Sequence, residues 1–135
     1  FTALIGQVFA ALMAGNSVIH LGDLGQDLVS KLEEYLPQGV LQDAKESDKE
    51  SLLSDIRIAG VCMVSNTEEV IQLQLTLANK AGLLCQLIPE TDVVNYATLA
   101  QPNYIHKFTT EQTISTNTTA VGGNATLLEL GSKTD

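Results

Sequence analysis

"IRIAGVCMVSNTEEVIQLQLTLANKAGLLCQLIPE", residues 56–90, holds two short apolar runs on either side of a longer amphipathic segment, and it decides the fold class. The runs at 56–64 and 83–89 are short and aliphatic, as buried strands are. The alternation in 72–77 would suit a strand, but the flanking residues favour a helix over about 67–81. A strand, a helix and a second strand in succession predict a parallel βαβ unit.

The ends of this central helix carry the expected signals. Asn66 or Thr67 can cap its first turn, and two acids follow at the positive end of the helix. Lys80 and Gly82 stand where a helix usually stops.

The same alternation of helices and strands is expected upstream of this stretch. The upstream elements that we expect are a helix over 1–14 stopped by Gly15, a strand at 17–21, a helix over 24–35 with Asp23 as its N-cap, and a strand at 39–42. Apolar strands joined by helices predict an α/β protein with a Rossmann-like, doubly wound, mostly parallel sheet.

Two segments are expected. Residues 1–95 form the Rossmann-like domain, whose usual first strand would lie before Phe1. Residues 96–135 form an extended β tail, with strand-forming stretches at 104–118 and 125–130 and a turn around Gly122-Gly123. The tail has few large apolar residues, so we expect it to gain its burial from another surface. Because the chain begins with Phe1, we interpret it as part of a longer polypeptide.

Composition narrows the function classes. With 44% hydrophobic and 17% charged residues among 135, the chain is too apolar to be disordered. Its net charge of −9 and seven scattered basic residues argue against nucleic-acid binding. No transmembrane segment or signal peptide is indicated. Cys62 and Cys85 lie in apolar runs, which suits free thiols in a reducing cytosol; a disulfide between them is the minor alternative.

The order of four segments resembles the coenzyme domain of aldehyde dehydrogenases. These segments are "FTALIGQVFAALMAGNSVI", "LPQGVLQ", "IAGVCMVSNTEEV" and "LLCQLIPET", and the similarity covers residues 1–95. In that family a helix ending in Ala-Gly-Asn precedes a strand, a Gly-Ser-Thr-Glu turn precedes a later helix, and a Glu-Thr-Gly-Gly turn carries the general base.

The tail resembles a second family. "TISTNTTAVGGNATLLELG" (113–131) is similar to the C-terminal motif of long bifunctional proline utilization A (PutA) flavoproteins, in which a degenerate aldehyde-dehydrogenase-like domain follows the true dehydrogenase. The resemblance implies a non-catalytic domain that packs on the L-glutamate γ-semialdehyde dehydrogenase domain and helps close the substrate tunnel. FAD and NAD would then belong to the parent protein. The implied interaction residues are Thr113, Ile114, Asn117, Thr118, Gly122, Gly123 and Asn124.

The catalytic pattern of the family is incomplete. Glu90 matches the general base, but no Cys follows it to serve as the nucleophile, and Thr91-Asp92 follows where the family has Thr-Gly-Gly. We therefore expect no catalytic residue in this segment and interpret Glu90 as a vestigial match, an acid that caps or hydrogen-bonds locally.

The coenzyme pattern is incomplete as well. The family shows a ribose-binding Lys after the strand at 17–21, where the chain has His20-Leu21-Gly22-Asp23, and Ser65 replaces the first Gly of the Gly-Ser-Thr-Glu turn. We therefore expect no cofactor in this segment. Neither His20 nor His106 has partners at metal-ligand spacing, so no metal site is expected.

The favoured hypothesis is a structural and interaction domain of a cytoplasmic, proline-catabolising enzyme whose parent can also lie peripherally at the inner membrane. Its partners would be other domains of the same polypeptide and a second protomer. Two alternatives stay open: a fragment of an NAD-dependent aldehyde dehydrogenase whose Cys lies on an absent segment, and a nucleotide-binding regulatory domain.

Overall fold

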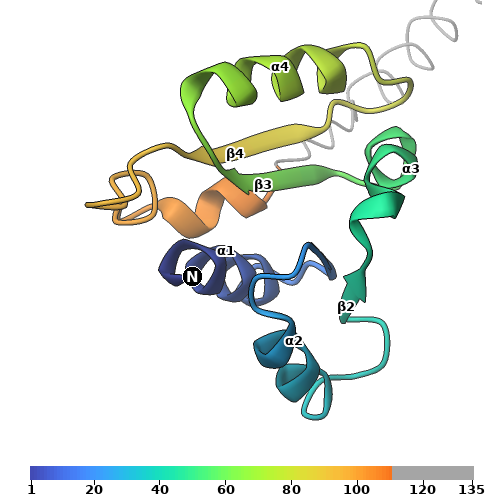
Figure 1. Cartoon of the computed structure of the whole chain (residues 1–135), viewed down its shortest axis with the longest axis vertical. Helices are drawn as coiled ribbons and strands as arrows, with labels where there is room; N and C mark the ends of the chain where they lie inside the picture. The colour runs from blue at the N-terminus through green and yellow to red at the C-terminus, as the bar shows by residue number, and fades with distance from the viewer. Residues whose placement is uncertain (111–135) are drawn as a thin grey trace, which may run out of the picture.

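The computed structural model describes residues 1–110 as helices alternating with short strands (Figure 1). The elements in chain order are α1 (Thr2–Met13), β1 (Val18–Leu21), α2 (Gln26–Glu33), β2 (Leu41–Ala44), the 3-10 helix η1 (Glu46–Asp48), α3 (Lys49–Ser54), β3 (Gly60–Val64), α4 (Thr67–Ala78), β4 (Gln86–Glu90) and the 3-10 helix η2 (Tyr104–Phe108).

The strands form two parallel βαβ units. In the first unit β1 pairs with β2, so that Val18 lies opposite Leu41. In the second, β3 pairs with β4, so that Val64 lies opposite Glu90. The expected α/β class with parallel strands is confirmed at this level.

One continuous doubly wound sheet is not present within residues 1–110. The two units are separate two-stranded sheets, since β1 and β3 share no ladder of hydrogen bonds. Helix α1 contacts both β1 and β3, and it therefore joins the two units through side-chain packing. One such contact is the Gln7 side chain, whose Nε2 donates to the carbonyl oxygen of Met63 at 3.3 Å.

The first unit holds the main apolar core. Val8 of α1, Val29 of α2 and Leu41 of β2 are each at most 4% exposed and pack together. The surrounding side chains, which are only partly buried, are Leu4, Leu12, Val18, Leu32 and Leu36. The core thus unites three elements that are distant in sequence through the apolar stripes seen in the sequence.

The second unit has helices on both sides of its strands. Helix α4 covers one face of the β3–β4 pair, while α1 and η2 lie on the other side (Figure 1). The buried apolar residues here are Leu77 of α4, Ile88 of β4 and Tyr104 of η2. Tyr104 also packs edge-to-face on Phe108, with ring centroids 5.2 Å apart.

Helix ends follow the sequence signals in two places and depart from them in one. Asn66 caps α4 by accepting the N–H of Glu69 at 3.0 Å, and Gly15 follows α1 with a φ of 84°, which favours glycine. The expected cap at Asp23 is wrong, because α2 begins after Gly25, whose φ is 93°.

Two further expectations are corrected. The run at 56–64 becomes a strand only from Gly60, because Ile58 N–H bonds back to the Asp55 carbonyl in a turn. Residues 104–108 were expected to be extended, but they form η2. The four-residue spacing of Tyr104 and Phe108 lets their rings pack together on a helical turn. The remainder of the expected β tail, 111–135, lies outside the described residues.

Candidate functional site

Glu90 is the last residue of β4 and is only 1% exposed. Its Oε1 accepts the backbone N–H of Asp92 at 3.0 Å, and its Oε2 accepts those of Thr98 at 3.0 Å and Leu99 at 2.9 Å. A carboxylate has about four acceptor positions, so these amides occupy most of them. A general base needs a lone pair that faces its substrate or a water molecule, whereas both oxygens here are directed at the chain's own backbone.

The loop after β4 is built around these bonds. Asp92 Oδ1 accepts the N–H groups of Val94 at 3.1 Å and Asn95 at 2.8 Å, which makes a tight turn. The turn brings Thr98 and Leu99 back to the end of the strand. Glu90 therefore organises the segment that separates β4 from η2.

Cys62 is the cysteine nearest to this strand end. It lies opposite Ile88 in the register of β3 and β4. Its surface still reaches water, but the protein atoms around the thiol desolvate it and raise the pKa of Cys62 to about 12. A nucleophilic cysteine requires a lowered pKa, since the thiolate is the reactive form. Cys62 is thus a neutral thiol near neutral pH.

Cys85 lies on the opposite face of the same sheet. It precedes β4 and shares the α4-facing side with Leu87 and Pro89. Both cysteines are free. Side chains on opposite faces of a strand pair cannot meet, which explains why no disulfide joins them.

His20, at the end of β1, is held by acceptors on both ring nitrogens. Nδ1 lies 2.7 Å from Asp43 Oδ1, and Nε2 lies 2.9 Å from the carbonyl oxygen of Leu24. The His20 side chain is 4% exposed and that of Asp43 33%. The His20 side chain is therefore turned inward and bound to Asp43 of β2.

Acidic residues in the first turn of α4 lie at the turn that precedes this helix. Besides the Asn66 cap, the hydroxyl of Ser65 donates to the carboxylate of Glu69. The N-terminus of a helix attracts anions, but Glu68 and Glu69 already supply negative charge there. A pyrophosphate at this turn would meet like charge.

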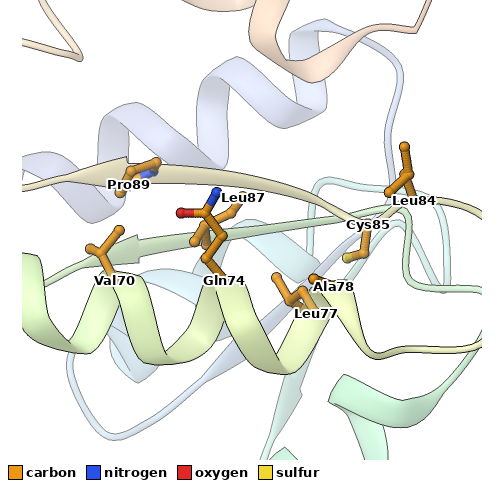
Figure 2. Close-up of a pocket in the computed structure, with 8 residues that line it drawn as sticks. All are labelled: Val70, Gln74, Leu77, Ala78, Leu84, Cys85, Leu87 and Pro89. Atoms are coloured by element: carbon orange, nitrogen blue, oxygen red, sulfur yellow. The ribbon is translucent and has the colours of Figure 1, made fainter.

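A groove runs between α4 and the outer side of β4, with a volume of about 260 Å³ (Figure 2). None of the side chains that line it is charged. They are Val70, Gln74, Leu77 and Ala78 from α4, and Leu84, Cys85, Leu87 and Pro89 from β4 and the segment before it. The groove is suited to an apolar segment and offers no ionisable group for catalysis other than the Cys85 thiol.

Helix α1 exposes a second apolar surface. Phe1, Phe9 and Met13 are 61%, 43% and 75% exposed. Phe9 and Met13 are four residues apart and share one side of the helix, about 100–140° around from Val8, while Phe1 is the residue that precedes the helix. We call these three residues the α1 outer face.

Sequence reasoning placed Glu90 at a strand end but missed the backbone amides of Thr98 and Leu99. The Asp92 turn is the signal that could have shown how the chain folds back. It also missed the α4–β4 groove, for which the apolar run Leu83-Leu84 was the available sign. The implied interaction residues, Thr113, Ile114, Asn117, Thr118, Gly122, Gly123 and Asn124, lie outside the described residues.

The described part of the chain has neither a metal-binding cluster nor a membrane-spanning helix. Within residues 1–110, no group of three or more His, Cys, Asp or Glu side chains is arranged to hold a metal ion. In the same part of the chain, no helix has the length and apolar character that crossing a membrane requires.

Comparisons with known proteins give no relative. No protein-family model matches the chain, and neither the curated proteins nor the solved structures contain a match.

Proposed function

We propose that this chain is a non-catalytic docking domain of a bifunctional proline-catabolising enzyme. In this proposal it packs on the L-glutamate γ-semialdehyde dehydrogenase domain and helps to close the tunnel through which the semialdehyde intermediate passes. The basis for this identity is the resemblance of residues 1–95 to aldehyde dehydrogenases and of residues 113–131 to the PutA tail. FAD and NAD would be bound by other domains of the parent.

The α1 outer face is the observation that carries the docking role. Helix α1 contains no charged residue, and a helix that is apolar on all sides is normally buried on all sides. Here one side packs on the core, while Phe1, Phe9 and Met13 remain in contact with solvent. A neighbouring domain that covers this face would complete its burial.

The contacts of the former active-site positions agree with a role without catalysis. Glu90 is bound by three backbone amides, His20 by Asp43 and the Leu24 carbonyl, and the α4 N-terminus by Glu69. Each of these contacts stabilises the domain and occupies a position that a substrate or coenzyme would need.

The proposal extends to the fold and its surroundings. In the complete polypeptide, we expect β1 and β3 to approach and form one doubly wound sheet in the order β2-β1-β3-β4. The partners are the other domains of the polypeptide and a second protomer, with no nucleic acid, and the location is cytoplasmic or peripheral at the inner membrane.

Addition of the chain in trans tests the docking role. The chain is added to the parent polypeptide truncated before Phe1, and binding is followed by sedimentation. We expect the unmodified chain to bind and the Phe9→Glu/Met13→Glu variant not to bind. Tyr35→Glu, a control at a more exposed site outside α1, should bind normally. Equal binding by all three chains would refute the role of the α1 outer face.

Calorimetry with NAD separates this proposal from the two alternatives that bind a nucleotide. A docking domain gives no binding heat, whereas a dehydrogenase fragment or a nucleotide sensor binds the coenzyme. Saturable NAD binding to the isolated chain would contradict the proposal.

A further inference from the structure

The α4–β4 groove combines an apolar lining with an available sheet edge. Leu77 is 5% exposed at its base, while Leu84 is 93% exposed at its rim. The apolar side chain at the rim is therefore left uncovered within the described residues 1–110.

The backbone of β4 adds hydrogen-bonding groups to this groove. The Gln86 N–H bonds to the Ala59 carbonyl, and the Glu90 carbonyl accepts the Ser65 N–H. In a parallel pair alternate residues bond to the same neighbour, so Leu87 and Pro89 direct their backbone groups to the opposite edge. Pro89 has no N–H, so this edge presents the Leu87 N–H and the carbonyls of Leu87 and Pro89. A short extended segment fits such an edge better than a long strand.

We propose that residues 126–130 of this same chain, "TLLEL", dock in the α4–β4 groove. Leu128 and Leu130 would contact its apolar lining. In an extended segment alternate side chains point to opposite sides, so Leu127 and Glu129 would point away from the lining that Leu128 and Leu130 contact. This arrangement keeps the acid away from a groove that has no charged side chain to receive it.

The length of the chain after Thr110 permits this docking. Thr126 follows Thr110 by sixteen positions. Extended at about 3.3 Å per residue, this stretch spans roughly 50 Å. The twelve-residue helix α4 is only about 18 Å long, so the tail can pass from η2 to the α4 side of the sheet.

Covalent attachment favours this occupant over a second copy or a separate protein. A segment tethered by a short linker experiences an effective concentration in the millimolar range, roughly, so that weak apolar contacts suffice to hold it.

The alkylation rate of Cys85 can show whether the groove is occupied, because Cys85 lines it. In the Cys62→Ser background it is the only thiol, and its alkylation rate is measured in the isolated full chain. We expect Leu128→Asp/Leu130→Asp to accelerate the reaction at least about fivefold, because undocking exposes Cys85. The control Ile114→Asp lies in the same tail and should leave the rate unchanged. Equal rates in all three proteins would overturn the proposal.

A cross-link gives the second readout. In the Cys62→Ser background, Leu128→Cys is oxidised under mild conditions, and a disulfide to Cys85 requires the two Cα atoms to lie within about 7 Å. We expect an internally linked monomer from Leu128→Cys and none from the control Ile114→Cys. A linked dimer would assign the groove to a second copy, and absence of a link would exclude docking; either result overturns the proposal.

These two measurements use the isolated chain, with no neighbouring domain present. A failure of the docking proposal therefore leaves the proposed function standing, and a failure of the binding experiments in trans leaves the docking of 126–130 intact.

Discussion

Glu90 binds Leu99: its Oε2 accepts the Leu99 backbone N–H at 2.9 Å. Through this bond the end of β4 also reaches α1, because the Leu99 side chain lies directly against Gly6. A Cβ added to Gly6 would lie 2.5 Å from Leu99 Cδ1. The strand end, the following loop and the first helix are thus one packed unit, and the acid that resembles a catalytic base is what closes it.

Replacing Glu90 should therefore destabilise the fold. Glu90→Ala leaves three backbone N–H groups without their carboxylate, and we expect a loss of about 3 kcal/mol in the free energy of unfolding. Glu90→Gln keeps one acceptor oxygen, so its free energy of unfolding should lie between those of the unmodified chain and Glu90→Ala. Urea unfolding measures both variants, with the exposed Glu34→Ala as the control. Stability equal to that of the unmodified chain would show that the amide contacts contribute little.

The contact between Gly6 and Leu99 can be measured with a double-mutant cycle. Gly6→Ala alone should cost about 1–3 kcal/mol, because the new methyl group clashes with Leu99. In the Leu99→Ala background the clash is absent, and alanine is the better helix former by about 1 kcal/mol. Gly6→Ala should then be neutral or stabilising. If it destabilises both backgrounds equally, the two residues are not coupled.

Cys62 should react only as a weak nucleophile. Burial raises the pKa of its thiol to about 12, so the thiolate fraction is small near neutral pH. In the Cys85→Ser variant, alkylation of Cys62 should accelerate about tenfold per pH unit from pH 7 to pH 10 without a plateau. The raised pKa stabilises the fold below the ordinary thiol pKa of 9.0, and this contribution is lost as the pH rises towards 12. A plateau below pH 9 would indicate an activated cysteine.

Local signals predicted most helices and strands, and non-local contacts explain most of the differences. The Asn66 cap and the Gly15 stop could be predicted because their hydrogen bonds and backbone angles involve neighbouring residues. The 3-10 helix at 104–108 could not be predicted, because the conformation of β-forming residues such as Tyr104 and Phe108 depends on the side chains that they pack against. Separation of the strands into two pairs likewise depends on how α1 packs between β1 and β3, which no local pattern specifies.

The site could be predicted only in part for the same reason. The sequence placed Glu90 at a strand end and showed that no Cys follows it. The amides of Thr98 and Leu99 that bind Glu90 come from a loop whose return path depends on the Asp92 turn and on the contact with Gly6. Apolar residues of α1 were visible as a stripe, but which of them remain exposed depends on the neighbours that α1 meets.

Leakage of the intermediate tests the central claim most directly. Under the proposed function, the parent polypeptide converts proline to the semialdehyde, and this conversion is run with an aldehyde-trapping reagent in solution. We predict that Phe9→Glu/Met13→Glu increases the trapped semialdehyde while the rate of each separate reaction stays unchanged. Trapping at the unmodified level in this variant would contradict a role in docking and tunnel closure.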